Sequence, residues 1–286
     1  MNNIVTDSNY INCKNEYGIL QKVIVCEPQY MEIKEIINNV QLQYKKTNID
    51  RSLAIKQHRN FVKILQTAGI EVNTLPTSKY LPEQVFTRDI GFSIGNQLFI
   101  SKMAKSIRQG EEKILANWVS SIYQVPFKEL SIHSIEGGDV LVDGDRAFIG
   151  LSNRTSIEAI HLLQHELLNI EILPIMFNPD YLHLDCVFNI LSPRDALIYS
   201  AAFNSTTLRL LSNFYNLIEV SEQEQFTMGT NILSIGSNRL ISLSTNVEIN
   251  YQLRKRGYEI FEVDFSEIIK SGGSFRCCTL PLVRDG

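Results

Sequence analysis

Apolar positions gather in four short segments of the chain, each of which is interrupted by a few polar turn residues. Each segment has one apolar stretch, a turn rich in glycine, asparagine, aspartate or serine, and a second apolar stretch. This pattern is typical of a β-hairpin. The four predicted hairpins cover residues 92–100, 140–149, 188–198 and 232–241.

The predicted hairpins recur at a nearly constant interval, because they start 48, 48 and 44 residues apart. A further step of 48 predicts a fifth unit near residue 280, where the apolar stretch 279–283 gives only half a hairpin. We expect the apolar stretch 20–26 to supply the other half. The two ends of the chain would then pair and close a ring.

Between the hairpins, apolar residues follow the spacing of helices. Helices are predicted over 111–119, 156–167 and 198–211, with one or two more between 31 and 68. Short strands are predicted after the helices, for example over 69–73 and 257–263. Each unit is therefore ββαβ, and the fold class is α/β, with five units around a pseudo-symmetry axis in one catalytic domain, 1–286. The alternative is an ordinary α/β domain with accidental spacing.

The composition changes this picture little. Of the 286 residues, 44% are hydrophobic and 20% charged, and the net charge is −4. Without a long basic stretch, a nucleic-acid partner is not expected. No apolar run approaches the roughly 18 residues of a membrane span, and the first residues do not resemble a secretory signal, so we expect a cytoplasmic protein. The oligomeric state stays open, a homodimer included.

Five cysteines occur at irregular positions, namely Cys13, Cys26, Cys186, Cys277 and Cys278. Their odd number and spacing argue against a disulfide framework. The chain has no C-x-x-C and no H-E-x-x-H motif, so we expect no metal and no cofactor. Each thiol is expected to be either a small buried side chain or a reactive group.

Polar residues precede the hairpins at matched places in the repeat. Asp89, Asp185 and Cys277 each lie three residues before the start of a unit, and Glu136 and His183 lie close to the equivalent place. If the units are related by rotation, these five side chains converge at one end of the axis. Taken singly, each of them also fits a structural role, such as capping a turn.

Together the five residues favour a particular chemistry. A cysteine thiolate is a nucleophile, and a histidine moves protons near neutral pH. Several carboxylates accept paired hydrogen bonds from a planar cation such as guanidinium. Asp139 is expected to play a supporting role beside them. The residues alone therefore indicate a cysteine-dependent enzyme that acts on a small guanidino substrate.

The ordered set of motifs resembles the guanidine-modifying (amidinotransferase and arginine deiminase) superfamily, which has a five-bladed ββαβ propeller called the pentein fold. The resemblance covers nearly the whole chain and rests on residues 15–20, 87–89, 136–139, 148–155, 183–185 and 272–277. In length, in the segment that ends at Arg154 and in the Cys277-Cys278 doublet, the chain is most similar to the dimethylarginine dimethylaminohydrolases. The stretch 276–282 is closer to the ending of an arginine deiminase.

The resemblance implies roles for individual residues. Cys277 would be the nucleophile, His183 the acid and base, and Glu136 the third catalytic residue. Asp89 and Asp185, with Glu136, would bind the guanidinium. Arg154, and as a second choice Arg108, would bind the carboxylate of an amino-acid substrate, whereas Arg88 would be a structural ion-pair partner.

The reaction implied is hydrolysis of dimethylarginine to citrulline and a methylamine through a covalent thiouronium intermediate. Arginine deiminase, agmatine deiminase and amidinotransferase activities are alternatives on the same scaffold. A more distant alternative is a non-catalytic ring protein, like the ribosome anti-association factor that shares the fold. Such a protein would have no need of a thiol, an imidazole and carboxylates at matched positions.

Overall fold

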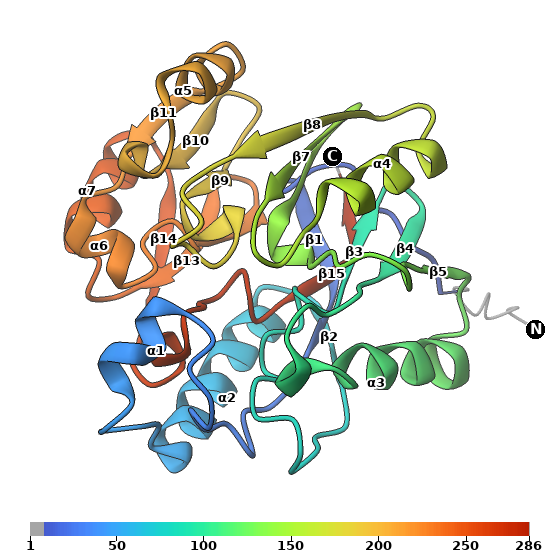
Figure 1. Cartoon of the computed structure of the whole chain (residues 1–286). Helices are drawn as coiled ribbons and strands as arrows, with labels where there is room; N and C mark the ends of the chain where they lie inside the picture. Colours follow the sequence, from blue (N-terminus) through green and yellow to red (C-terminus); the bar gives the residue numbers. More distant parts are fainter. Residues whose placement is uncertain (1–8, 286) are drawn as a thin grey trace, which may run out of the picture.

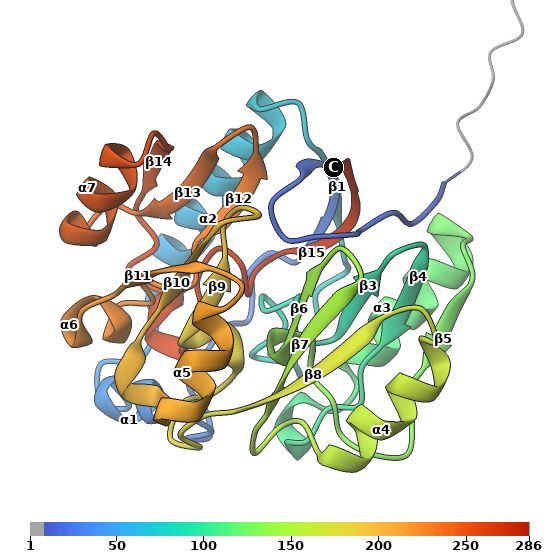
Figure 2. The same cartoon turned by 90° about the horizontal axis from the view of Figure 1, so that it is seen from above.

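A computed structural model describes residues 9–285 of the chain. Its strands form five separate three-stranded sheets, which lie around a common centre (Figure 2). The sheets are, in chain order, β3 (Gly91–Ile94), β4 (Gln97–Ile100) and β5 (Phe127–Glu129); β6 (Val140–Asp143), β7 (Arg146–Leu151) and β8 (Glu171–Met176); β9 (Phe188–Ile190), β10 (Asp195–Ile198) and β11 (Asn216–Glu219); β12 (Leu233–Gly236), β13 (Arg239–Leu243) and β14 (Glu259–Val263); and β15 (Leu280–Asp285), β1 (Ile19–Val25) and β2 (Glu71–Thr74).

The same pairing is repeated in every sheet. Two strands pair antiparallel as a hairpin, or across the chain ends in the fifth sheet, and a third strand then pairs parallel to the middle one. A parallel third strand requires a crossover, and a helix provides it in each unit (Figure 1). The helices are α1 (Asn39–Tyr44), α2 (Arg51–Thr67), α3 (Glu111–Trp118), α4 (Ile157–Glu166), α5 (Ser205–Ser212), α6 (Glu222–Phe226) and α7 (Val247–Lys255). The predicted ββαβ units, and with them the α/β fold class, are confirmed.

The fifth sheet is made from both ends of the chain. Strand β1 pairs antiparallel with β15, so that Ile24 lies opposite Leu280 and Val23 opposite Pro281. Its other edge pairs parallel with β2. The predicted pairing of the two chain ends is therefore confirmed.

Two hairpin turns show why the polar interruptions recur. Gly95 and Gly144 have φ angles of 58° and 64°, in the left-handed region that glycine enters without strain. Each stands between two strands that pair directly, β3 with β4 and β6 with β7. The glycine turns predicted from the sequence are thus the points at which the chain reverses.

One predicted helix begins later than expected. The helix expected over 198–211 starts at Ser205, because Ile198 still belongs to β10 and a short 3-10 turn follows at Ser200–Ala202. The side chain of Asn204 accepts a hydrogen bond from the backbone N–H of Thr207, which is the contact of a helix N-cap. The helical spacing of apolar residues continues from β10 into α5 and so does not mark where the helix begins, whereas the N-cap at Asn204 does.

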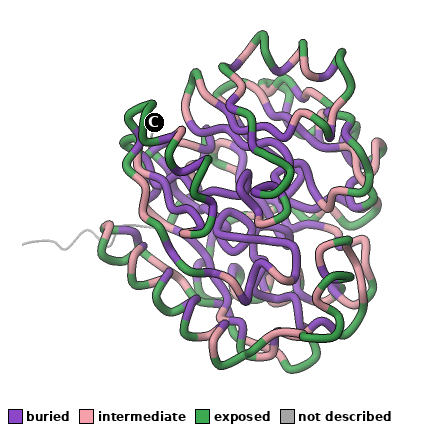
Figure 3. The backbone as a smooth tube through the Cα atoms, turned by 90° about the vertical axis from the view of Figure 1, so that its left-hand side faces the viewer, coloured by how far each residue is buried: buried purple, intermediate pink, exposed green. Residues whose placement is uncertain are grey.

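Apolar side chains fill the space between the sheets and their helices. One cluster packs α2 against β12–β14 through residues such as Phe61, Ile241 and Phe265. The buried residues concentrate towards the centre of the molecule and the exposed ones towards its outer loops and helix turns (Figure 3). No helix in the part of the chain that the structure describes is both long and apolar enough to cross a membrane.

Candidate active site

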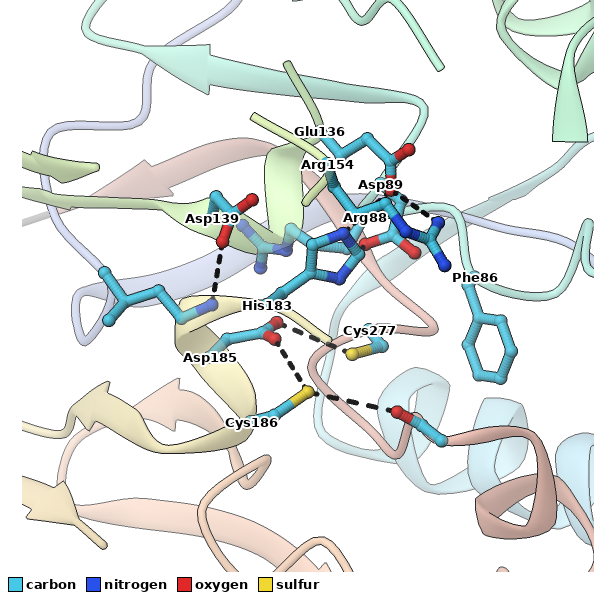
Figure 4. Close-up of polar contacts among 12 residues, drawn as sticks. Phe86, Arg88, Asp89, Glu136, Asp139, Arg154, His183, Asp185, Cys186 and Cys277 are labelled. Carbon is cyan, nitrogen blue, oxygen red and sulfur yellow. Dashed lines mark hydrogen bonds and ion pairs between the residues drawn. The ribbon is translucent and has the colours of Figure 1, made fainter. Parts of the chain in front are cut away.

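The five predicted site residues lie just before the first strand of their units. Asp89 precedes β3, Glu136 precedes β6, His183 and Asp185 precede β9, and Cys277 precedes β15. Because the units surround a common centre, these turns meet there, and Figure 4 shows the side chains together. The structure thus brings together residues that are up to 188 positions apart in the sequence.

The imidazole of His183 lies between two carboxylates. Its Nε2 is 2.8 Å from Oε2 of Glu136, and its Nδ1 is 3.5 Å from Oδ1 of Asp89. A Cβ atom at Gly138 would lie only 2.6 Å from Nδ1 of His183. The glycine in the 136–139 motif is therefore required for the imidazole to approach so closely.

The sulfur of Cys277 has its own polar surroundings. It lies 3.5 Å from Oδ2 of Asp185 and 3.0 Å from Nδ2 of Asn231. The backbone N–H of Cys277 donates a 3.0 Å hydrogen bond to Oδ1 of the same asparagine. Asn231 therefore holds both the backbone and the sulfur of the cysteine in position.

Asn231 is a site residue that the sequence analysis did not select. It stands two residues before β12 and is the contribution of the fourth unit to the cluster. Asn231, like the other site residues, is a polar residue just ahead of a predicted hairpin. An asparagine suggests no reaction chemistry by itself, so this position alone does not mark it as a site residue.

Arg108 has a different environment from the one expected of a substrate-binding arginine. It is buried, and its guanidinium lies 2.5 Å from Oδ2 of Asp89 and 2.8 Å from Oε2 of Glu111. A third hydrogen bond goes to the carbonyl of Phe86. These contacts make Arg108 a residue that positions Asp89, since its hydrogen bonds are directed to protein groups.

Arg154 lies closer to open space. Its Nη1 is 3.4 Å from Oε2 of Glu136, and its Nη2 donates a 2.9 Å hydrogen bond to the carbonyl of Ile37. It also lines a cavity of about 280 Å³ together with Lys105 and Asn153. Arg154 therefore lies between Glu136 and a cavity whose charged lining residues are Lys105, Arg154 and Asp180.

Asp139 and Arg88 point away from the cluster. Asp139 accepts hydrogen bonds from the N–H of Leu184 (2.9 Å) and from the hydroxyl of Ser152 (2.6 Å), and so supports the turn that carries His183. Arg88 lies 3.8 Å from Glu16. The ion-pair partner of Asp89 is therefore Arg108, although Arg88 is its neighbour in the sequence.

Burial and neighbouring charges set the protonation of the site. Burial alone lowers the pKa of His183, but the carboxylates of Asp89, Asp139 and Glu136 outweigh it and raise that pKa. Burial alone would raise the pKa of Glu136, but the hydrogen bond and the charge of His183 outweigh burial and lower that pKa. Burial and the nearby Asp185 raise the pKa of Cys277, so the resting cysteine is a thiol.

The three residues Asp89, Glu136 and His183 also have donor atoms within 4.8 Å of one another, which is close enough to hold a metal ion. Their chemistry does not favour one. A metal needs a neutral imidazole, whereas these carboxylates favour the protonated form of His183. Asp89 and Glu136 already face the guanidinium groups of Arg108 and Arg154. This donor set suits an organic cation better than a metal.

A segment from 36 to 44, which includes α1, contacts Arg154 and the chain that leads to Cys277. The side chains of Cys277 and His183 are 1% and 0% exposed, so a substrate reaches them only if something moves. Arg154 binds the carbonyl of Ile37, and the side chain of Asn38 donates to the carbonyl of Ser271 (2.9 Å). We call residues 36–44 the cover segment; in Figure 1 its helix α1 lies beside the chain that leads to β15.

A buried carboxylate fastens the cover segment to the body of the protein. Glu83 accepts hydrogen bonds from Nε2 of Gln41 (2.7 Å) and from the hydroxyl of Ser271 (2.8 Å). Burial raises the pKa of Glu83 to about 7. The folded protein therefore holds a proton at Glu83 over a pH range in which the unfolded chain has lost it.

This shift predicts a pH-dependent stability. Since the folded pKa lies above the unfolded one, the contribution of Glu83 is full below about pH 4.5 and is lost as the pH rises through about 7. In Glu83→Gln that loss should be absent. We expect the free energy of unfolding of the wild type to fall relative to Glu83→Gln by up to about 3 kcal/mol between these pH values.

Urea unfolding at a series of pH values measures the effect. Glu129→Gln, at an exposed position, is the matched control and should follow the wild type. Parallel stability curves for the wild type and Glu83→Gln would show that Glu83 keeps an ordinary pKa.

A larger cavity of about 490 Å³ lies on the other side of the cover segment. Cys186 lines it, and the sulfur of Cys186 is 3.6 Å from Oδ1 of Asp185, the carboxylate that also contacts Cys277. Asn38 and Tyr181 line both cavities. The catalytic cluster is therefore flanked by two cavities that the cover segment separates.

Five ββαβ units that bring a cysteine, a histidine and carboxylates to one buried centre define the class of guanidine-modifying enzymes with the pentein fold. Within that class the chain belongs to the dimethylarginine dimethylaminohydrolase family, because residues 27–284 match the family model described as "N,N dimethylarginine dimethylhydrolase, eukaryotic". The enzymes of this type are hydrolases or transferases of guanidino compounds.

Individual proteins agree with this membership. The chain is 50% identical over 272 residues to the uncharacterized protein YkgA of Bacillus subtilis, with 95% of each chain covered. It is 29% identical over 237 residues to the N(G),N(G)-dimethylarginine dimethylaminohydrolase of Mycobacterium tuberculosis, covering 82% of this chain and 77% of the relative. The structure of SxtG, an amidinotransferase from Microseira wollei, superposes with a TM-score of 0.83 over 96% of this chain and 98% of SxtG at 18% identity, a similarity of fold alone.

Proposed function

We propose that the protein hydrolyses the guanidinium group of an arginine-like amino acid, with a methylated arginine as the preferred substrate, and releases citrulline and a methylamine. The observation that carries this proposal is the buried cluster itself, in which the thiol of Cys277 lies 3.5 Å from Asp185 and the imidazole of His183 lies 2.8 Å from Glu136 and 3.5 Å from Asp89. The family relatives support the same reaction type. We further propose that the enzyme works in the cytoplasm.

The carboxylates bind the substrate cation. Oδ1 of Asp89 makes no hydrogen bond with any residue between 9 and 285, so it is free to accept one from a guanidinium N–H. Asp185, 3.5 Å from the sulfur of Cys277, accepts a second on the side of the nucleophile. Glu136 adds negative charge beside His183. Paired, charge-assisted hydrogen bonds of this kind both hold and orient a planar cation.

The substrate also prepares the nucleophile. An opposite charge close to a thiol favours the thiolate and lowers its pKa. A bound guanidinium therefore offsets the burial that raises the pKa of Cys277 in the resting protein. Asn231 then stabilises the thiolate through its Nδ2–H, 3.0 Å from the sulfur. The cysteine becomes reactive only when the correct cation is present.

The reaction proceeds in two halves. The thiolate of Cys277 attacks the central guanidinium carbon and forms a C–S bond. His183 donates its proton to the methylated nitrogen, and the bond between that nitrogen and the central carbon breaks. The methylamine departs, and a covalent thiouronium remains on Cys277. His183 then accepts a proton from water, the hydroxide adds to the same carbon, and the C–S bond breaks. The products are a ureido amino acid and the regenerated cysteine.

The amino-acid end of the substrate is assigned to the cavity beside Arg154. That cavity is lined by Lys105 and Arg154 as cationic groups and by Asp180 as an acidic one, and Arg154 already lies 3.4 Å from Glu136, whereas Lys105 forms no ion pair within the described residues 9–285. A substrate carboxylate would complete the charge pairing there. Of the two arginines considered for this role, Arg154 is the one we retain.

Arginine deiminase activity is the second candidate. The stretch 276–282 resembles the ending of those enzymes, and arginine would fit the same charges with ammonia as the leaving group. An amidinotransferase would pass the amidino group to an amine in place of water. Hydrolysis of dimethylarginine and of arginine would pass through the same alkyl-thiouronium on the cysteine and differ in the leaving group. In an amidinotransferase the amino-acid amine would leave, so only the amidino group would stay on the sulfur before its transfer.

A substrate panel tests the proposal. Arginine, monomethylarginine, both dimethylarginines, agmatine and guanidinoacetate are each incubated with the enzyme, and mass spectrometry follows ureido product, ammonia and methylamines together. We expect kcat/KM to be largest for a methylated arginine. Agmatine, which lacks the carboxylate, should be slower by about 10²-fold or more, because Lys105 then lacks the ion-pair partner that the substrate carboxylate supplies.

Equal rates for agmatine and arginine would contradict the placement of the carboxylate. Ammonia from arginine at a higher kcat/KM than methylamine from any methylated arginine would establish the deiminase instead. Product formation that requires an added amine would establish the transferase.

A further inference from the structure

Three buried arginines lie on the far side of the catalytic turns from the substrate. Arg88 precedes Asp89, and Arg276 precedes Cys277, so successive residues of the same turn point to opposite sides. Arg276 connects the two sides, because its Nη1 lies 2.6 Å from Asp185 and its Nη2 lies 3.1 Å from Glu16. Glu16 and Arg88, together with Arg284, line a small chamber.

The charges around this chamber do not balance. Arg88, Arg276 and Arg284 are 4%, 1% and 2% exposed, and the only carboxylates that act on them at close range among residues 9–285 are Glu16 and Asp185. Cys13, which also lines the chamber, is neutral because burial raises its pKa to about 12. Three positive charges therefore face two negative ones, away from water.

The hydrogen bonds are incomplete as well. Nη2 of Arg88 and Nε of Arg276 and Arg284 make no hydrogen bond with any described residue. The remaining donors of Arg284 bind the neutral carbonyls of Gly18 and Ser234, both at 2.8 Å. Burying a cation with unpaired donors costs several kcal/mol unless a negative partner is present.

The pKa values of two of these arginines are lower than that of a free arginine. Burial and the charge of Arg276 lower the pKa of Arg88 to about 10. Burial also lowers the pKa of Arg284. Each shift means that one more negative charge in the chamber would stabilise the charged form of both side chains.

We propose that this chamber is a binding site for one small monovalent inorganic anion of the chloride type, held between Arg88 and Arg284. The chamber volume is about 10 Å³, which corresponds to roughly one water-sized particle. We therefore expect a single-atom anion here in preference to the larger sulfate or phosphate. The carboxylate of Glu16 also lines the chamber: its Oε1 accepts hydrogen bonds from Arg276 and from the N–H of Val142, and its Oε2 lies 3.8 Å from Nη1 of Arg88.

The site is independent of the substrate cavity and of the reaction proposed above. It is linked to Cys277 in two ways: Arg276 binds Asp185 on one side and Glu16 on the other, and the backbone N–H of Arg88 donates a 3.0 Å hydrogen bond to the carbonyl of Cys277. The anion would complete the charge balance around the turn that carries Cys277. Its first expected effect is therefore on the stability of the folded protein.

Crystals grown with sodium bromide test the site directly. We expect an anomalous difference peak at the bromine edge between the guanidinium groups of Arg88 and Arg284. A water-like peak without anomalous signal at this place would overturn the proposal. This measurement uses the unaltered protein and needs no enzyme activity.

Thermal unfolding provides the test in solution. At equal ionic strength, we expect the midpoint in sodium chloride to exceed that in sodium gluconate, whose anion is too large for the chamber, by at least about 2 °C. Arg88→Met should lose this difference. Arg146→Met, which removes an exposed ion pair with Glu171, is the control and should keep it. An equal chloride effect in the two variants would show that the anion binds elsewhere.

Discussion

Replacing Cys277 by serine is expected to abolish turnover of every guanidino substrate. The serine hydroxyl keeps the volume of the side chain and the hydrogen bond to Asn231, but it is a far weaker nucleophile than a thiolate at neutral pH. We expect kcat to fall by at least about 10⁴-fold, with little change in the thermal midpoint. Steady-state assays on the best substrate of the panel, with calorimetry on the same protein, measure both quantities.

Cys278→Ser is the matched control, because it makes the same atomic change one residue further along. Cys278 is fully buried in the apolar cluster that contains Phe61 and Phe275. The change should lower stability by roughly 1–3 kcal/mol, since it buries a hydroxyl in an apolar site. Activity should persist. Loss of activity in Cys278→Ser together with normal activity in Cys277→Ser would overturn the choice of nucleophile.

Replacing His183 by alanine is the second change with a large expected effect. Without the imidazole, no group donates a proton to the leaving nitrogen or accepts one from water. We expect kcat to fall by about 10²–10⁴-fold. Intact-mass spectrometry after mixing with substrate should show either the unmodified protein or a stable adduct on Cys277.

His161→Ala, on the exposed face of α4, controls for the loss of a histidine and should keep full activity. Turnover at the wild-type rate in His183→Ala would exclude an acid or base role for this residue. A restored rate on addition of imidazole to the variant would instead support the assigned role, since the missing group is then supplied from solution.

The fold was largely predictable because its signals are local and repeated. Each hairpin was marked by apolar alternation around a turn such as that at Gly95 or Gly144, and the constant interval between hairpins predicted the fifth sheet. The helix start at Ser205 was misplaced, because the cap at Asn204 is a single side-chain contact that apolar spacing does not reveal.

The convergence of the site was predictable for the same reason, since rotation places equivalent residues at one centre. The contacts within it were not. Arg108 and Arg154 look alike in the sequence, and only three-dimensional packing shows that the first is enclosed by Asp89 and Glu111 whereas the second borders a cavity. The cover segment, held by Gln41, likewise depends on partners more than 40 residues away.

The pairing of β1 with β15 sets the order in which the enzyme can be completed during its synthesis. Ile19–Val25 is among the first strands to leave the ribosome, yet its antiparallel partner, Leu280–Asp285, is translated after every other strand. Cys277 belongs to this late portion. Until β15 has been translated, the early strand exposes one unpaired edge, so the fifth sheet and the turn that carries Cys277 are completed after the strands of the other four sheets have been made.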